Sequence, residues 1–278
     1  MKRVVVTGSS GKVGRATVVE LSDAGYEVVG VDLVRGPAGH AGAVVADLTA
    51  MGQVLELLAG ADAVVHHAAI PAPGLRSEEV TFRTNMLSTF NVFEAAAVLG
   101  IGRVVWASSE MTLGLPFGPR LPDYAPVDED HALYPEQSYA LAKVLSEEVG
   151  RQYHRRFGTT VVALRFSNVM EPPDYELFPS YWKDARLRSW NLWGYIDVRD
   201  AARSTRLALE AEISGAHSLI IAAADTVMDR PSAELMSEVF PSVAVRPLDD
   251  PYATLLSITR ARKVLGYEPA FSWRRVLG

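Results

Sequence analysis

The sequence predicts an α/β fold in which a doubly wound parallel sheet is covered by helices on both faces. Three observations support this prediction. Short β-rich runs alternate with longer helical patterns along most of the chain. These runs are apolar throughout, which is typical of strands buried on both faces. A glycine-rich turn follows the first run and precedes a helical pattern.

The elements can be assigned in order along the chain. The expected strands are "RVVVTG", "YEVVGVD", "AVVAD", "ADAVVHHAA", "RVVWASS" and "TTVVALRF". Helical patterns occupy residues 12–24, 48–58, 78–99, 138–157 and 198–210. Residues 113–137 and 171–195 interrupt this alternation, and loops this long usually carry function or cover a site.

These elements predict one Rossmann domain with a small split lobe. The domain takes residues 1–165 plus about 196–223, and the substrate-binding lobe takes about 166–195 plus 224–278. Aromatic residues from Tyr175 to Tyr195 are expected to form the core of this lobe. The alternative is a platform on which a sugar face stacks.

Composition limits the function. The 278 residues contain no apolar run near the roughly 20 residues of a membrane span, and they begin with no export signal. We therefore expect a cytoplasmic protein. With no cysteine and no metal-ligand spacing among six histidines, no metal site is expected. A net charge of −6 without a basic block argues against nucleic-acid and anionic-membrane partners.

The turn contains Gly8, Gly11 and Gly14, with Lys12 and Val13 between the last two. Glycine at these positions suits a tight turn, a close approach of backbone to a pyrophosphate, and packing of the helix on the strand. The N–H groups at the helix start would face the phosphates. A tight turn without a ligand would use the same residues.

The second strand favours dinucleotide binding over that alternative. It ends in Asp32, 18 residues after Gly14, where a carboxylate can accept hydrogen bonds from the adenosine ribose. Because a carboxylate repels a 2′-phosphate, NAD is favoured over NADP. Arg35, three residues later, either accommodates that phosphate or is a solvated side chain.

Further motifs resemble those of the extended short-chain dehydrogenase/reductase family, which includes sugar epimerases, dehydratases and uronate dehydrogenases. They are "VVADLT", "DAVVHHAAIPAP", "TNMLSTFNVFEAA", "VVWASSEMTLG", "SYALAK" and "KVLGYEPAFSW". The resemblance runs nearly end to end. It implies NAD as cofactor, and it adds these cofactor-binding residues: Asp47, Leu48, His67, Ala68, Ala69, Asn85 and Ser108.

Tyr139 and Lys143 are four residues apart, so they share one face of a helix. A lysine ammonium beside a tyrosine stabilises the phenolate and lowers its pKa towards the working range. By resemblance, Tyr139 transfers the hydroxyl proton during hydride transfer, and Lys143 also bonds the nicotinamide ribose. Ser109, 30 residues earlier, would orient the substrate.

Two charged residues have open roles. Glu110 is either an acid/base group, as in dehydratases of the family, or a loop carboxylate. Arg165 either binds an anionic substrate or pairs with an acid near residues 128–130.

The preferred function is NAD-dependent redox chemistry at a secondary alcohol or ketone of a sugar, uronate or related small polyol. An NAD-retaining epimerase or dehydratase is the alternative, and a non-catalytic dinucleotide sensor is an alternative of another class. The short lobe predicts a compact substrate, although its basic residues are candidates for clamping a diphosphate: Lys183, Arg186, Arg188, Arg230 and Arg246. The resemblance also implies a homodimer joined through helices 78–99 and 138–157.

Overall fold

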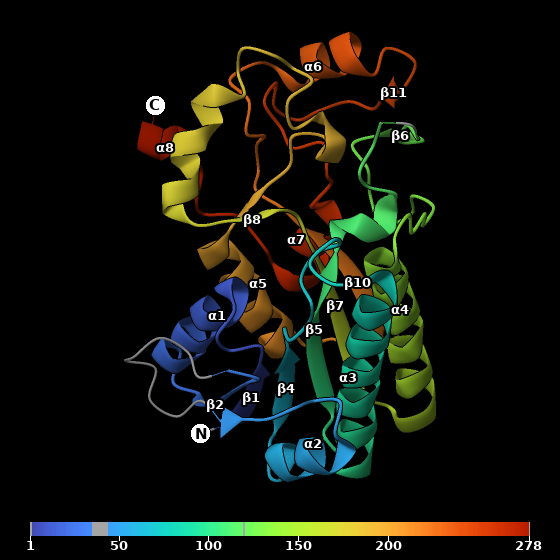
Figure 1. Ribbon diagram of the computed structural model, residues 1–278. Helices are drawn as coiled ribbons and strands as arrows, with labels where there is room; N and C mark the ends of the chain where they lie inside the picture. The colour runs from blue at the N-terminus through green and yellow to red at the C-terminus, as the bar shows by residue number, and fades with distance from the viewer. Residues whose placement is uncertain (1, 35–43, 119, 278) are drawn as a thin grey trace.

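A seven-stranded parallel sheet forms the centre of the molecule (Figure 1). The computed structural model describes residues 2–34, 44–118 and 120–277. In spatial order the strands are β10 (Ala216–Ile221), β7 (Thr160–Phe166), β5 (Arg103–Ser109), β4 (Ala63–His66), β1 (Arg3–Thr7), β2 (Glu27–Asp32) and β3 (Val44–Val45). This arrangement confirms the predicted fold class.

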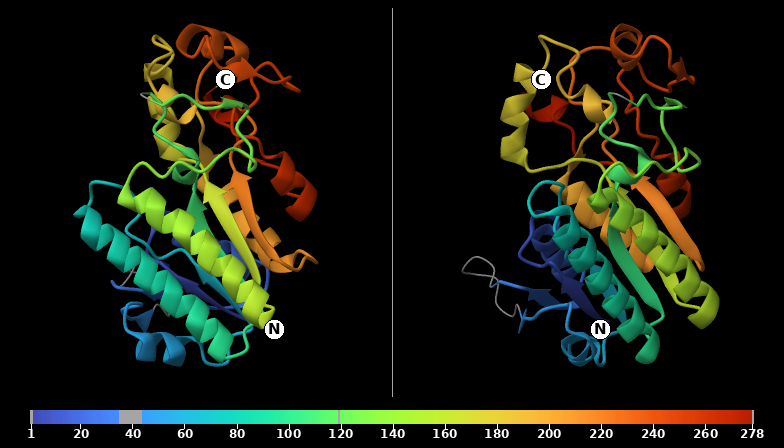
Figure 2. Two further views of the ribbon diagram at one scale, coloured as in Figure 1. Left: turned by 90° about the vertical axis from the view of Figure 1, so that its right-hand side faces the viewer. Right: turned by 45° about the vertical axis from the view of Figure 1, so that its right-hand side comes forward.

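Helices cover both faces of the sheet. Helices α1 (Lys12–Asp23) and α5 (Val198–Glu210) pack together on one face. Helices α2 (Met51–Leu58), α3 (Glu78–Val98) and α4 (Ser138–Phe157) cover the other, and Figure 2 shows α3 and α4 side by side. Strand β1 contributes side chains to the hydrophobic core on both faces of the sheet. Val4 and Val6 belong to one hydrophobic cluster, and Val5 belongs to the other.

Most predicted boundaries lie within one or two residues of the observed ones, and the largest deviations, of three residues, lie at the end of β4 and at the start of α2. The helix expected from residue 48 begins at Met51. Asp47 Oδ1 accepts hydrogen bonds from the Thr49 backbone N–H at 2.8 Å and the Thr49 hydroxyl at 2.7 Å. This local turn competes with helical hydrogen bonding, so the helix starts later.

Short elements occupy most of the region beyond the carboxyl ends of the strands (Figures 1 and 2). They are η1 (Glu110–Leu113), β6 (Tyr124–Ala125), β8 (Val169–Met170), η2 (Pro172–Ser180), η3 (Ser189–Asn191), β9 (Ile196–Asp197), α6 (Ser232–Val239), β11 (Ala244–Val245) and α8 (Arg274–Leu277). Helix α7 (Thr259–Leu265) packs against β10 and α5.

The aromatic residues of the segment 171–195 are mostly core. Tyr175, Phe178, Trp193 and Tyr195 are fully buried, and they belong to the same hydrophobic cluster as Leu164 of the sheet. The lobe therefore packs directly on the sheet through a continuous core. Its treatment as a separate unit, with the predicted boundaries, stays a prediction.

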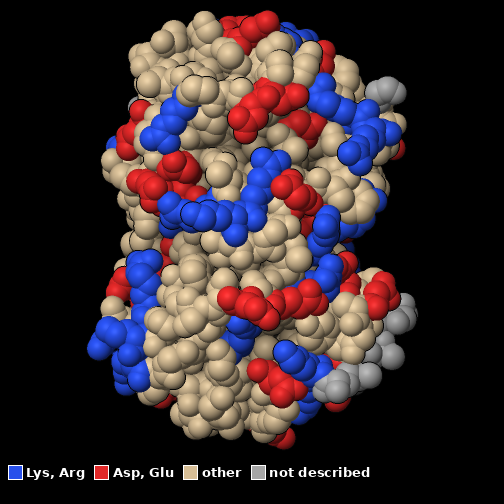
Figure 3. All heavy atoms as spheres, turned by 180° about the vertical axis from the view of Figure 1, so that it is seen from behind, with Lys and Arg blue, Asp and Glu red and all other residues tan. Residues whose placement is uncertain are grey.

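Charges of both signs are interspersed on the face shown in Figure 3. Many charges of the described chain are paired. Arg206, for example, contacts Glu20 of α1 and Glu210 of its own helix, each at 2.7 Å. Within the described residues, no helix is long and apolar enough to cross a membrane. The same residues contain no cluster of His, Asp and Glu suited to a metal ion.

Candidate active site

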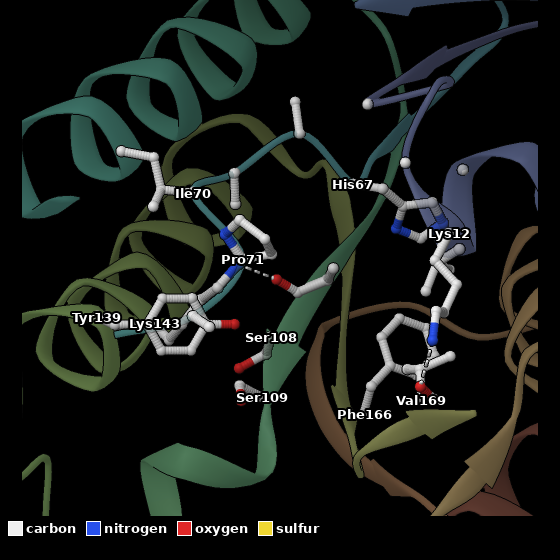
Figure 4. Close-up of a pocket in the computed structure, with 18 of the residues that line it drawn as sticks. Lys12, His67, Ile70, Pro71, Ser108, Ser109, Tyr139, Lys143, Phe166 and Val169 are labelled. Atoms are coloured by element: carbon white, nitrogen blue, oxygen red, sulfur yellow. Dashed lines mark hydrogen bonds between the residues drawn. The ribbon is translucent and has the colours of Figure 1, made fainter. Parts of the chain in front are cut away.

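A cavity of about 930 Å³ runs along the carboxyl edge of the sheet, from the glycine turn to Ser109 and Tyr139. It spans the point between β1 and β4 where the strand order reverses, which is where ligands bind in doubly wound sheets. Figure 4 shows Tyr139, Lys143, Ser108 and Ser109 on one side of the close-up, with His67 and Lys12 on the other side.

The glycine turn allows very close backbone contacts. Gly8 has a φ of +71°, and a Cβ on it would lie 2.6 Å from the Ala68 nitrogen. A Cβ on Gly14 would lie 2.0 Å from the Gly8 oxygen. Larger residues would therefore disrupt the turn at both positions. Gly11, Lys12 and Val13 line the cavity at the start of α1.

Lys12 also connects the turn to the lobe. Its Nζ donates to the Val169 carbonyl at 3.3 Å and lies 3.0 Å from a carboxylate oxygen of Asp174. Asp32 is fixed at the end of β2, because its oxygens accept from the Ser10 N–H at 2.9 Å and the Leu33 N–H at 2.7 Å. Arg35 lies outside the described residues.

The motif after β4 forms the middle of the wall. His67, Ala68 and Ala69 line the cavity, as do Asp47 and Leu48 from the β3–α2 connection. His67 Nε2 lies 3.2 Å from Thr17 Oγ1, and its Nδ1 has no hydrogen-bond partner among the described residues. Burial and the charge of Lys143 lower the pKa of His67 to about 3, so the ring is neutral.

Asn85 does not line the cavity. Its Oδ1 accepts from the Ile70 N–H at 2.8 Å and its Nδ2 donates to the Ile70 carbonyl at 3.1 Å. Each of these two amide atoms can form one further hydrogen bond, so contact of Asn85 with the cofactor stays a prediction, while the amide shapes the wall by holding Ile70.

Ser109 ends β5, while Tyr139 and Lys143 lie in the first turns of α4, and all three side chains line the cavity. Figure 4 shows the Tyr139 hydroxyl directed towards the two serines. Lys143 Nζ donates to the Ala107 carbonyl at 2.5 Å and lies 5.7 Å from the Tyr139 ring centroid. The residues predicted to move the proton thus converge.

Their titration differs from the expectation. Burial raises the pKa of Tyr139 to about 12, and the charge of Glu110 adds to this while the Ser109 hydroxyl opposes it. Burial lowers the pKa of Lys143 to about 8, against the attraction of Glu147. The expected lowering of the Tyr139 pKa by Lys143 is wrong for this state, because desolvation of the phenolate dominates.

Glu110 lines the cavity next to Ser109 and is buried. Its carboxylate oxygens accept from the Ser167 hydroxyl at 2.6 Å and from Asn191 Nδ2 at 3.2 Å. Burial raises the pKa of Glu110 to about 7, although these hydrogen bonds and the charge of Arg188 lower it. A carboxyl with this pKa can act as acid or base near neutral pH.

Arg165 requires a correction. It is buried, does not line the cavity, and forms a two-point ion pair with Glu147, at 2.9 Å and 2.7 Å. The structure therefore supports neither substrate contact nor direct pairing with residues 128–130. The guanidinium lies at a central strand, where burial requires a close counter-charge.

The five lobe cations also do not line the cavity. Arg246 pairs with Asp128 and Arg230 with Glu238, both at 2.7 Å, while Lys183 and Arg186 are exposed. Arg188 lies near the cavity: its Nη2 donates to the Gly194 carbonyl at 3.1 Å, and its charge acts on Glu110.

Several lining residues were not predicted from the sequence. They are Ser167, Asn168 and Val169 after β7, Trp190 in the lobe, and Ile70 to Pro73 after the histidines. The position of residues 167–169 was a usable signal, since they follow the end of a central parallel strand. Nothing in the local sequence marked Trp190 among its aromatic neighbours.

Comparison with known proteins identifies similar chains. A family described as "NAD dependent epimerase/dehydratase family" matches residues 4–222. An NAD-dependent glucose-6-phosphate dehydrogenase of Haloferax volcanii is 26% identical over 96% of this chain and 92% of its own. A UDP-glucose 4-epimerase of Corynebacterium glutamicum is 25% identical over 96% and 91%.

Among solved structures, an Agrobacterium tumefaciens short-chain dehydrogenase/reductase superfamily protein with bound NAD has a TM-score of 0.77. It is 24% identical and covers 99% of this chain and 94% of its own. This likeness independently supports the fold.

Proposed function

The chain belongs to the NAD dependent epimerase/dehydratase family and is an NAD-dependent enzyme, and from this premise we propose its reaction. It transfers a hydride between NAD and a secondary alcohol or ketone of a small sugar, uronate or polyol. One observation carries the proposal: Ser109, Tyr139 and Lys143 converge in the same cavity as the glycine turn and Asp32. As the family and relatives are enzymes, the sensor alternative is dropped.

The cavity suits NAD along its whole length. Gly8 and Gly14 leave no room for side chains where a pyrophosphate must approach the backbone. We assign the pyrophosphate to residues 8–14, including Lys12, and the adenosine ribose to Asp32. Asp47 and Leu48 would contact adenine. His67, Ala68 and Ala69 would line the middle, with Ser108, Tyr139 and Lys143 at the nicotinamide end.

When bound, NAD supplies the hydride acceptor or donor. Ser109 would orient the substrate oxygen, and Tyr139 would take or give its proton. The Lys143 ammonium stabilises the phenolate form of Tyr139 as that proton moves. With a Tyr139 pKa of about 12, the phenol is the stable form before reaction and is ready to protonate a carbonyl oxygen.

The alternative is an epimerase or dehydratase that retains its NAD. Glu110 favours it specifically, since a buried carboxyl with a pKa of about 7 lines the cavity beside Ser109. Such a group suits a second acid/base step that a simple dehydrogenase does not need.

The nucleotide content of protein purified without added cofactor separates these functions. For a dehydrogenase we expect an empty or exchangeable site, because NAD must leave after each turnover. NAD released only on denaturation, together with a changed product isomer and no net NADH, would favour the epimerase.

The substrate remains a proposal. We infer a compact one from the small lobe and from the absence of the five lobe cations from the cavity lining. Against this, the chain matches over most of its length both a dehydrogenase named for glucose 6-phosphate and an epimerase named for a UDP-sugar. Length alone therefore does not exclude a nucleotide sugar.

We also infer a homodimer, as the resemblance implied. The outer faces of α3 and α4 expose Leu87, Phe90, Leu141 and Leu145, each between 39% and 45% accessible. An apolar surface over two adjacent helices suits a self-complementary interface. The cytoplasmic location stays a prediction.

A further inference from the structure

Glu147 lies one helical turn after Lys143 on α4, and its carboxylate is completely buried. Four hydrogen bonds reach it. Oε1 accepts from Ser108 Oγ at 2.6 Å and Arg165 Nε at 2.9 Å, while Oε2 accepts from Arg165 Nη2 at 2.7 Å and Ser218 Oγ at 2.9 Å. Each of the two carboxylate oxygens therefore accepts two hydrogen bonds, which is its full capacity.

These partners come from three adjacent strands. Ser108 lies on β5 and Arg165 on β7, where the two residues are directly opposite each other. Ser218 lies on β10, the next strand of the sheet. One carboxylate thus links α4 to the three strands β5, β7 and β10, next to the cavity. Ser108 lines that cavity.

The same carboxylate acts on Lys143. Its negative charge favours the ammonium form of Lys143 and opposes the effect of burial. The other titratable groups around the lysine do not replace it: Tyr139 shares its helix and is a neutral phenol, while His66 and His67 on the β4 side are neutral rings. Arg165 is positive and pairs with Glu147, and its charge also opposes the effect of burial, which raises the pKa of Glu129.

We propose that Glu147 is a positioning residue for the proposed redox reaction, which keeps Lys143 charged and holds Ser108 in register with it across α4 and β5. Arg165 has the complementary task of fixing the carboxylate at this place. The inference rests on the proposed function for its catalytic meaning, but its effect on Lys143 can be measured without a substrate.

A purely structural ion pair makes a different prediction. A buried pair can often be replaced by apolar residues of similar volume without loss of stability, whereas removal of one partner leaves an uncompensated charge. The informative variant is therefore the double substitution Glu147→Leu with Arg165→Met. The matched control is Ser218→Ala, which removes one hydrogen bond to the same carboxylate and leaves both charges.

The experiment uses the full chain labelled with 13C at the lysine side chains. There are only five lysines, and the Lys143 resonance is assigned from its loss in Lys143→Arg. Its titration is followed by NMR, and NADH affinity is measured by fluorescence over the same pH range. Circular dichroism and thermal unfolding establish that each variant is folded.

In the double variant we expect the Lys143 midpoint to fall, because the charge of Glu147 raises the pKa of Lys143 and outweighs the opposing charge of Arg165 that is lost with it. Because the ammonium is then lost earlier, the NADH Kd at alkaline pH should rise about tenfold for each unit. Ser218→Ala should keep the wild-type midpoint. If the folded double variant keeps the wild-type midpoint and NADH affinity, Glu147 is only structural. A shifted midpoint in a protein that turns over no substrate would support this inference and count against the proposed function.

Discussion

Tyr139 and Lys143 lie one turn apart on α4, yet the lysine ammonium is bonded to the Ala107 carbonyl at 2.5 Å while lying 5.7 Å from the centre of the tyrosine ring. The hydrogen bond of the lysine ammonium therefore goes to the backbone of β5, and we expect its charge to act on the tyrosine only when the hydroxyl proton moves. The tyrosine hydroxyl alone is placed beside Ser109 for transfer of a proton (Figure 4).

This division of roles predicts separate losses for the two residues. Tyr139→Phe removes the transferable proton but no cofactor contact of the ring, so turnover should fall by about 10²- to 10⁴-fold with NADH affinity nearly unchanged. Lys143→Ala should weaken both. Initial rates and NADH fluorescence titrations measure these effects. A Tyr139→Phe variant with near-normal turnover would move the acid/base role elsewhere, with Glu110 the next candidate.

Asp32 predicts the choice of cofactor. Its carboxylate, fixed by the Ser10 and Leu33 N–H groups, should accept from the ribose hydroxyls of NAD and repel the 2′-phosphate of NADP. NAD should bind more tightly than NADP, and Asp32→Ala should narrow the difference. Calorimetric titration of both cofactors decides this, and equal affinities in the wild type would refute the assignment.

Glu110 predicts a pH dependence of stability. Its pKa is about 7 in the folded protein, above the ordinary value of 4.5, so the neutral form is favoured by folding. The contribution of the neutral Glu110 carboxyl to folding stability is fully present below the unfolded pKa of 4.5, and it is lost as the pH rises through the folded pKa of about 7. We therefore compare the free energy of unfolding of the wild type with that of Glu110→Gln. As the pH rises from below 4.5 to above 7, the wild-type value should fall by on the order of 3 kcal/mol relative to the variant.

Urea unfolding of both proteins across this range measures the difference. The comparison cancels the titration of all other carboxylates, since these are common to both chains. A difference in unfolding free energy that does not vary with pH would mean that the folded and unfolded proteins bind the Glu110 proton equally well, so that folding does not raise the pKa of Glu110.

If the apolar faces of α3 and α4 form a dimer interface, one charged residue introduced into that interface should prevent self-association. Phe90 is 45% exposed on α3, and Phe90→Glu should convert the expected dimer to a monomer. Val19 on α1 is also exposed, at 52%, but on the opposite face of the sheet, so Val19→Glu is the matched control. Sedimentation velocity distinguishes the two, and a monomeric wild type would contradict the proposed interface.

The sequence was sufficient for six of the seven strands of the sheet and for the five helices α1 to α5, because these depend on local patterns. Apolar strand runs, the glycine spacing and the position of Asp32 each follow from short-range geometry. Helix α4 was predicted at residues 138–157, its observed bounds. The strands are readable from the sequence because a strand buried on both faces must be apolar along its whole length.

The expectations that were wrong concern side chains whose partners are distant in the sequence. Arg165 was expected to meet substrate or an acid near residue 128, whereas it meets Glu147, which on a helix resembles one more solvated acid. The hydrogen bonds of Asn85 to the backbone of Ile70 were likewise not predicted. The pKa of Tyr139 was misjudged for a related reason, because desolvation depends on the complete packing around the ring and not on the spacing to Lys143.

The most direct test supplies the wild-type enzyme with NAD and follows NADH absorbance with free aldoses, uronates and polyols, in parallel with UDP- and dTDP-sugars. The product isomer ratio is recorded in each case. We predict that NADH accumulates with at least one compact substrate and not with the nucleotide sugars. Turnover confined to nucleotide sugars, or isomerisation without net NADH, would contradict the account.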